Sequence, residues 1–202
     1  WLEFRRVLFR SNALNNLAMI YMDQEKYDLA EKYYLMAVKY NNGSAMTNLG
    51  LIYENQKKYD LAEKYYLMAV EEESDTGMYN LGLLYDNQKK YTLAEKYYLM
   101  AIQNNYSDAM YNLALLYDNQ EKFSLAEKYY LMAIKENDSD AMYNLGLIYD
   151  NQKKYPLAEK YYLMAVEAND SDAAFNLALL YDNQKKYNLA EKYYLIAVKD
   201  NS

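Results

Sequence analysis

The sequence repeats itself with a fixed period, which constrains the fold more than any other feature. The tripeptide Ala-Glu-Lys begins at Ala30, Ala62, Ala94, Ala126, Ala158 and Ala190. The dipeptide Asn-Leu keeps the same period, from Asn16 to Asn176. Self-similarity of this length is typical of proteins that stack similar structural units in a row. We therefore expect residues 12–202 to form one repeat domain of six units, with approximate bounds 12–43, 44–76, 77–108, 109–140, 141–172 and 173–202.

Each unit is expected to contain two helices joined by a polar turn. In residues 109–140, Met110, Leu113 and Tyr117 have the spacing of one helical face. The polar run 118–122 interrupts this face and predicts the turn. Three further residues then share one face of a second helix: Ala126, Tyr130 and Ala133. The pattern predicts an all-α fold in which Tyr117 and Tyr130 lie in the core and Tyr129 is half exposed.

Polar residues near the expected helix ends suggest how each helix begins. Ser124 precedes Glu127 by three residues, which predicts a capping box at the start of the second helix. One unit has Pro156 at the serine position instead, and proline suits the first turn of a helix. Ser139 or Asp140 is expected to cap the first helix of the following unit.

These residues resemble the tetratricopeptide repeat. The order Leu113-Ala114-x-x-Tyr117, followed by Ala126 and Tyr130, is similar to the family's order of small and large residues. The turn between units is similar to that of the Sel-one-like relative, and the period of 32, from Ala30 to Ala62 for example, is shorter than the family's 34. The resemblance implies an α-solenoid, a right-handed superhelix of stacked antiparallel hairpins. With helices about 10 Å across, six pairs would extend for about 60 Å.

The composition argues against catalysis. The chain has no histidine and no cysteine, so it lacks the usual general base, the thiol nucleophile and the common zinc ligands. Its five glycines are dispersed and form no phosphate-binding loop. Acidic pairs recur with the repeat, whereas an active site is singular. We therefore predict a protein that is not an enzyme and that takes no cofactor and no metal.

The charge of the chain indicates which partners to expect. A net charge of −7 disfavours nucleic acid, which binds basic surfaces. No apolar run has the length of a membrane span. The absence of cysteine favours a cytoplasmic location, with the nucleus as an alternative. Lysine pairs in the hairpin turns are interpreted as solvated residues, with an anionic contact as the alternative; they are Lys57-Lys58, Lys89-Lys90, Lys153-Lys154 and Lys185-Lys186.

The two ends of the chain depart from the repeat. Residues 1–11 do not fit it, and Arg5, Arg6 and Arg10 are the only arginines. We predict a non-native or linker segment there, with a divergent capping helix as the alternative. The sixth unit ends near Ser202 without a polar closing helix, although repeat arrays normally carry polar caps. We therefore expect a longer native chain, and end-to-end self-association through the terminal units is an alternative.

The resemblance implies a non-catalytic scaffold or adaptor that binds a protein partner, which is an inference by analogy of fold. In the family, the first helix of each repeat lines a concave face that binds peptides. One alternative is a substrate-docking arm of a larger enzyme whose catalytic domain lies outside this sequence. Another is a self-assembling repeat module.

A row of asparagines is the expected centre of the binding face. An asparagine amide offers a donor and an acceptor, so a row of them could hold the main chain of an extended peptide. The predicted face comprises Asn48, Asn80, Asn112, Asn144 and Asn176, with Tyr79, Tyr111, Tyr143, Phe175, Leu83, Leu115, Leu147, Asp86, Asp118 and Asp150. The aspartates predict a neutral-to-basic ligand. The alternative is that each asparagine only braces the neighbouring unit.

Overall fold

The computed structural model describes residues 2–199, with side chains from residue 5 onward. Within this range the chain forms twelve helices and no strand. The helices are α1 (Leu2–Asp23), α2 (Tyr27–Val38), α3 (Gly43–Asn55), α4 (Tyr59–Glu71), α5 (Asp75–Asn87), α6 (Tyr91–Gln103), α7 (Asp108–Asp118), α8 (Phe123–Lys135), α9 (Ser139–Asn151), α10 (Tyr155–Glu167), α11 (Ser171–Asn183) and α12 (Tyr187–Lys199).

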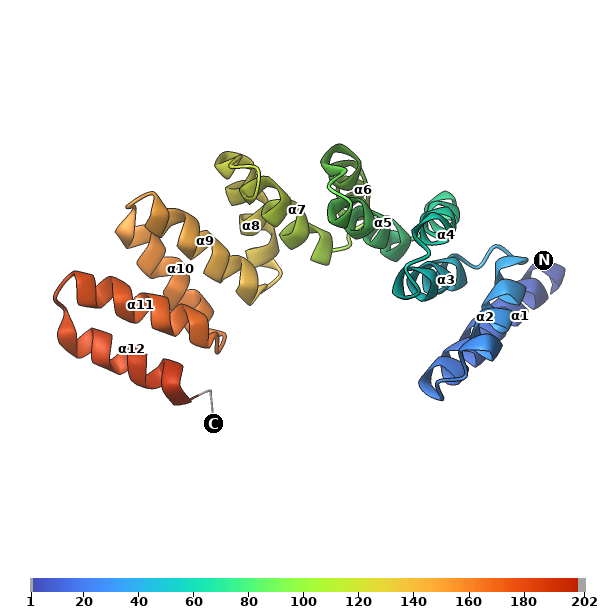
Figure 1. The fold of residues 1–202 in the computed structure, drawn as a ribbon, viewed down its shortest axis with the longest axis horizontal. Helices are drawn as coiled ribbons and strands as arrows, with labels where there is room; N and C mark the ends of the chain where they lie inside the picture. The colour runs from blue at the N-terminus through green and yellow to red at the C-terminus, as the bar shows by residue number, and fades with distance from the viewer. Residues whose placement is uncertain (1, 200–202) are drawn as a thin grey trace. The chain divides into compact units, whose positions relative to one another are not determined.

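Consecutive helices pair as antiparallel hairpins, as Figure 1 shows for α3 with α4 and for α11 with α12. The predicted all-α solenoid of helix hairpins is therefore confirmed. The chain divides into two compact units, Trp1–Ala109 and Met110–Ser202. In each unit, the second helix of one repeat also packs against the first helix of the next, as α4 does on α5 and α10 on α11.

Every turn between helices contains one residue with left-handed backbone. In the turn after α3, Lys57 has a φ of 59°, its N–H bonds to the carbonyl of Glu54, and the N–H of Lys58 bonds to the carbonyl of Tyr53. This pair of bonds is a Schellman motif, which satisfies carbonyls at a helix end. The left-handed residues are Glu25, Asn41, Lys57, Glu73, Lys89, Asn105, Glu121, Asn137, Lys153, Asn169 and Lys185. They recur at a constant interval of half a repeat, so each repeat consists of two halves of equal length.

The first helices are capped one residue earlier than predicted. The side chain of Asp138 accepts a hydrogen bond from the N–H of Ala141 at 2.8 Å, so Ser139 and Asp140 lie inside helix α9 and are not its cap. The left-handed residue Asn137 ends the preceding turn, so the next residue, Asp138, takes the N-cap position of α9. Asn42, Ser74 and Asp170 cap α3, α5 and α11 in the same way.

The predicted capping box of the second helices is wrong. Helix α8 begins at Phe123 with Lys122 as its N-cap, and no side chain bonds the free N–H groups there. Ser124 is already the second helical residue. The glutamates of the box instead serve the next repeat, since Glu31 and Glu63 accept hydrogen bonds from the hydroxyls of Tyr53 and Tyr85. Pro156 does lie in the first turn of α10, as predicted.

Small residues allow the helices of a hairpin to approach closely. Ala126 and Tyr130 of α8 are fully buried, and Tyr117 is 3% exposed, as predicted for the core. In the unit Trp1–Ala109, a methyl group added to Gly82 would lie 2.6 Å from the ring of Tyr98. The core of each hairpin is therefore a large tyrosine packed against glycine or alanine.

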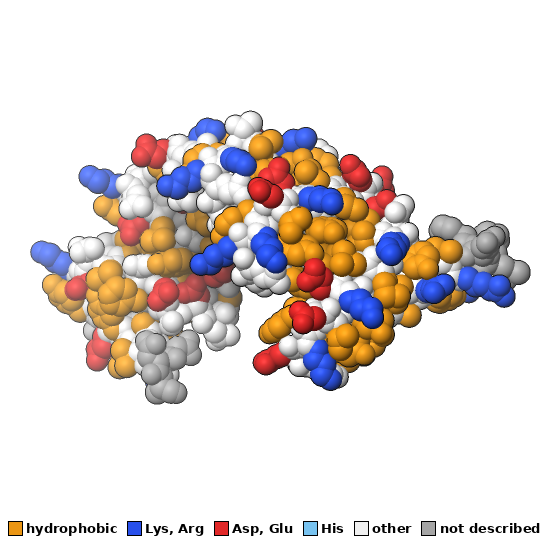
Figure 2. Space-filling model, turned by 45° about the vertical axis from the view of Figure 1, so that its right-hand side comes forward, with side chains coloured by type: hydrophobic (Ala, Val, Ile, Leu, Met, Phe, Trp, Pro, Cys, Tyr) orange, Lys and Arg blue, Asp and Glu red, His pale blue; other side chains and the backbone are white. Residues whose placement is uncertain are grey.

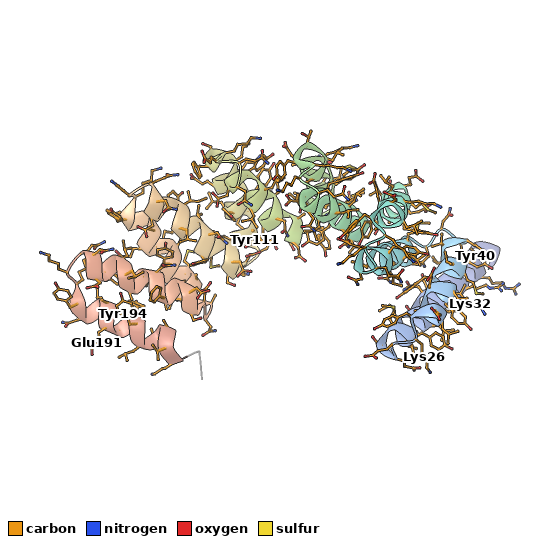
Figure 3. The ribbon with its side chains drawn as sticks, in the orientation of Figure 1. Lys26, Lys32, Tyr40, Tyr111, Glu191 and Tyr194 are labelled. Carbon is orange, nitrogen blue, oxygen red and sulfur yellow. The ribbon has the colours of Figure 1, made fainter. Side chains whose placement is uncertain are left out.

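Each hairpin contains a stack of two tyrosines, and a lysine ammonium lies over each ring. The rings of Tyr117 and Tyr129 are 5.7 Å apart, with Lys122 5.6 Å from the first ring and Lys128 4.7 Å from the second. This stack buries Tyr129 to 8% exposure, so the prediction that it is half exposed is wrong. Lys26 and Lys32, labelled in Figure 3, make the same contacts in the first hairpin.

The start of the chain forms one continuous helix with the first repeat. Helix α1 runs from Leu2 to Asp23, and Arg10 lies 5.6 Å from the centre of the Tyr40 ring. Val7 and Leu8 are exposed by 39% and 49%. Trp1 lies outside the described residues, and the non-native origin of residues 1–11 stays a prediction. Across the described residues, no helix combines the length and the apolar character needed to span a bilayer.

Candidate functional site

The residues predicted to form a binding face all lie on first helices, from α3 to α11, and their side chains share a narrow range of exposure. All of them are half-buried except Phe175, which is 49% exposed. Side chains in this state are accessible to a ligand and also packed on their neighbours. The positions are equivalent from repeat to repeat, and an aromatic ring, an amide and a carboxylate recur together at Tyr79/Asn80/Asp86, Tyr111/Asn112/Asp118 and Tyr143/Asn144/Asp150.

In the unit Met110–Ser202, the asparagines reach back to the preceding repeat. The amide nitrogen of Asn144 donates to the hydroxyl of Tyr111 at 3.2 Å and to the carbonyl of Asp140 at 2.9 Å. Asn176 donates to the hydroxyl of Tyr143 at 3.0 Å. Tyr111 projects from α7 in Figure 3. Each of these bonds joins an asparagine to a tyrosine 33 residues earlier, and so ties consecutive first helices together.

In the unit Trp1–Ala109, the asparagines make the same two kinds of contact, with other partner residues. The amide nitrogen of Asn80 donates to the carbonyl of Thr76 at 2.8 Å. Asn48 donates to the side-chain oxygen of Asn15 at 3.2 Å. Position 47, which corresponds to Tyr111, is a buried threonine whose hydroxyl bonds to its own helix and to Ser74. In each of these contacts of Asn48, Asn80, Asn144 and Asn176, the amide nitrogen is the donor.

Tyr111 and Tyr143 keep their protons at neutral pH because their pKa values are raised. Burial raises the pKa of Tyr111, and the charges of Asp140 and Asp138 raise it further, while the bond from Asn144 lowers it. Burial also raises the pKa of Tyr143. Each hydroxyl can therefore accept the bond from asparagine and still donate its own proton.

Each aspartate of the face lies near the hydroxyl of a buried tyrosine. The hydroxyl oxygens of Tyr98, Tyr130 and Tyr162 are buried and have no hydrogen-bond partner of good geometry. Their charged neighbours are Asp86, Asp118 and Asp150, which add to the effect of burial in raising the tyrosine pKa values. Burial also raises the pKa of Asp86 and Asp118, and the nearby tyrosine hydroxyl partly opposes this.

A cleft of about 400 Å³ opens beside one of these aspartates. Asp150 and Asn151 line it from the end of α9, and Lys153 and Tyr155 from the hairpin turn and the start of α10. Leu180 and Asn183 line it from α11, and Gln184 from the residue just after that helix. The cleft combines a carboxylate, an ammonium group and several amides with the apolar side chain of Leu180 and the ring of Tyr155. Such a cleft suits a polar side chain with an apolar stem. Among the described residues, no group of acidic side chains is arranged to hold a metal ion.

The structure also exposes apolar side chains that sequence reasoning missed. Figure 2 shows hydrophobic side chains interleaved with lysines and acidic residues on the face in view. Each second helix begins with an exposed aromatic residue and an exposed leucine, such as Tyr59 and Leu61, which are 46% and 37% exposed. The recurring Lys-Tyr-x-Leu after each hairpin turn could have revealed them. The residues of this motif start the second helix, where the first helix of the hairpin does not cover them.

Comparisons with known proteins agree with this architecture. One tetratricopeptide repeat profile matches residues 15–77 and 111–174, and a second matches 75–106 and 171–199. Proteins of this family are generally interaction scaffolds without catalytic activity. No curated protein sequence matches the chain significantly.

Several solved structures share the fold. PilF from Pseudomonas aeruginosa superposes with a TM-score of 0.78 at 18% identity, over 94% of this chain and 90% of PilF. A Sel1 repeat protein from Oxalobacter formigenes gives 0.72 at 22% identity, over 93% and 84%. YrrB, described as a repeat protein with an unusual peptide-binding site, gives 0.62 at 20% identity, over 82% and 91%. At these identities the likeness concerns the fold alone.

Proposed function

Because this chain belongs to the tetratricopeptide repeat family, we propose that it is a non-catalytic scaffold whose first helices bind an extended, neutral-to-basic segment of a protein partner. The observation that carries the proposal is the repetition of one half-buried set of groups, an amide, an aromatic ring and a carboxylate, on successive first helices. A periodic surface of this kind matches a ligand that is itself periodic, and the main chain of an extended peptide has that property.

The hydrogen bonds within the face assign a role to each group. The N–H groups of Asn144 already bind Tyr111 and the helix backbone, so its oxygen is left to accept from a peptide N–H. The tyrosine hydroxyl keeps a proton to donate to a peptide carbonyl. An asparagine and the tyrosine of the preceding repeat would thus contact the main chain together, which reconciles the bracing contact with a binding role.

Three asparagines test the proposal. A phage-displayed library of unstructured dodecapeptides would supply a binding peptide, and fluorescence anisotropy would measure its affinity. Changing Asn80, Asn112 and Asn144 together to alanine should weaken binding at least tenfold and keep the helical circular dichroism. Asn188→Ala, at the exposed start of α12, is the control that should change neither quantity. If the triple variant loses stability while its affinity is unchanged, the asparagines are only structural braces.

The composition of the chain bears on the cellular location and on the class of partner. We propose a cytoplasmic location, which the absence of cysteine supports. A substrate-docking arm of a larger enzyme would use the same face, so the asparagine variants test that alternative as well. The acidic balance of the chain supports a protein partner in preference to nucleic acid.

End-to-end self-association is a second candidate, and one observation favours it. Ile20 is 51% exposed, whereas its equivalents Ile52 and Ile148 are 5% and 3% exposed because a neighbouring repeat covers them. In the last repeat, Val198 is 70% exposed. Sedimentation velocity over a range of concentrations should show larger species that Ile20→Glu removes. A single species at all concentrations would contradict this candidate.

A further inference from the structure

Three repeats contain an incomplete hydrogen bond between a buried tyrosine and an acidic residue. In the second repeat the pair is complete, since the hydroxyl of Tyr66 donates to the carboxylate of Glu54 at 2.8 Å. In later repeats an aspartate, one methylene shorter, replaces that glutamate, and the hydroxyls of Tyr130 and Tyr162 have no partner of good geometry. Each aspartate therefore lies near a buried tyrosine hydroxyl but makes no well-formed hydrogen bond with it.

The side chains of Asp118 and Asp150 are half-buried and lie near the hydroxyls of Tyr130 and Tyr162. Asp150 lines the cleft of about 400 Å³, where the ring of Tyr155, 42% exposed, forms part of the wall. The carboxylate of Asp150, the ring of Tyr155 and the side chain of Leu180 together suit the stem and the charged end of a lysine or arginine side chain. Burial penalises the charged form of Asp118, and a bound cation would relieve that penalty.

The general spacing of neighbouring helices suggests how far apart the two carboxylates lie, and hence which ligand conformation would reach both. Asp118 is the last residue of α7, and Asp150 lies in the last turn of α9. The hydrogen bond from Asn144 to Tyr111 links these two helices. Neighbouring packed helices stand roughly 8–10 Å apart. A polyproline II helix advances about 3.1 Å per residue with three residues per turn, so every third side chain recurs on one face after about 9 Å.

We propose that Asp118 and Asp150 each bind one basic side chain, and that the unit Met110–Ser202 selects a polyproline II segment with lysine or arginine at every third residue. This proposal rests on the proposed function and specifies its ligand. The buried hydroxyls of Tyr130 and Tyr162 are positioning groups, which donate to the carboxylates once a cation holds these in one orientation. Asp86 occupies the equivalent position in the other unit.

The test compares two peptides of the same composition on the full chain. The probe is an acetylated and amidated peptide of four Ala-Pro-Lys triplets, and its control has the four lysines gathered at one end. The triplet peptide should bind about tenfold more tightly or better, because a hydrogen bond to a charged group is worth that factor. Since net charge and length are equal, general attraction to an acidic protein cannot produce the difference.

Two variants connect the preference to the named residues. Asp118→Asn with Asp150→Asn should weaken the triplet peptide about tenfold or more and should not lower Tm, because it removes two partly desolvated charges. Asp182→Asn is the matched control, since Asp182 holds the same template position in the last repeat and is exposed there. Lys153→Glu, which copies Glu121 of the preceding repeat, should tighten binding by removing a competing cation from the cleft.

The outcomes separate this proposal from the proposed function. Equal affinity for the two lysine arrangements, or unchanged affinity in the double aspartate variant, overturns the proposal. If the library-selected peptide binds through the asparagines and the triplet peptide does not bind, the proposed function stands and this specificity is wrong. If neither the library nor the triplet peptide binds, both are wrong.

Discussion

The first and second helices of each repeat begin differently, although the turns before them share one backbone motif. Before α9, the side chain of Asp138 bonds the N–H of Ala141. Before α8, Lys122 occupies the corresponding place, makes no such bond, and lies over the ring of Tyr117 instead. The Schellman motif therefore determines the backbone path in both turns. The residue at the cap position differs in its contact: Asp138 bonds a helix N–H, and Lys122 lies over a tyrosine ring.

This difference implies that the two kinds of helix depend on different interactions. A side-chain cap satisfies N–H groups that a helix start otherwise leaves without a partner. The second helices have no such cap, so they must be held by packing, and their Ala126-type alanines are fully buried between helices. First helices should therefore be sensitive at their caps, and second helices at their crossings.

The largest expected effect is at a helix crossing. Ala126→Leu should destabilise the protein by roughly 1–3 kcal/mol, because the fully buried site has no room for a larger side chain. Urea denaturation followed by circular dichroism measures the change. Ser124→Ala, in the first turn of the same helix, should have little effect because Ser124 is not the cap. An unchanged midpoint for Ala126→Leu would refute the assigned packing.

The next effect is at a cap of a first helix. Asp138→Ala should cost about 1 kcal/mol, the usual loss for a side chain that bonds a helix N–H. The same denaturation measurement gives the free energy of unfolding. Asp140→Ala, two residues later in the helix, is the control and should change it less. Equal losses for the two variants would contradict the assignment of Asp138 as the cap.

A smaller effect of opposite sign is expected at a left-handed turn residue. Lys57→Gly should stabilise the protein by about 0.5–1 kcal/mol, because glycine adopts a φ of 59° without the steric penalty of a side chain. Lys58→Gly should destabilise, because Lys58 has a φ of −89° and its ammonium lies over Tyr53. A loss of stability in Lys57→Gly would show that this lysine makes a favourable contact of its own.

The smallest effect concerns the lysines that replace the caps. Lys122→Met keeps the apolar stem and removes the charge over Tyr117, so it should cost about 0.5 kcal/mol. If the ring of Tyr117 is the partner of the Lys122 ammonium, the loss of stability should depend little on salt concentration. If a distant acidic residue is the partner, the loss should decrease as salt rises, because salt screens charges on the surface. Denaturation at low and high salt distinguishes these two sources.

The architecture could be predicted because it follows from the period alone. Six copies of one pattern required a row of equal units, and apolar spacing within a copy required two helices. The turn geometry could not be predicted in the same way. Glycine or asparagine would have marked the left-handed positions, but lysine and glutamate occupy several of them, and these residues carry no signal for that conformation. The start of α8 was therefore misassigned, because Glu121 carries no such signal, whereas Asn137 did mark the turn before α9 and its cap was missed by one residue.

The binding face could be predicted as a set of positions, but not as a set of contacts. The half-buried state of the face follows from the repeat template. The direction of the Asn144 amide depends on Tyr111 of another repeat, which a template of one unit does not contain. A comparison of side chains in neighbouring units could have found this pairing. The burial of Tyr129 was missed for a different reason: it depends on Tyr117 of the partner helix in the same unit, and helix periodicity alone does not show which rings of two helices stack.

The equal spacing of the left-handed residues has a mechanical consequence. Because both kinds of turn close with the same motif at half-repeat intervals, the chain is a series of one-helix segments of equal length. When the chain is pulled from one end, each segment that detaches should release about 55 Å of extended chain, at roughly 3.5 Å per residue. Force-extension traces would then show steps of half a repeat. A hairpin that detached as a whole would give steps twice as long.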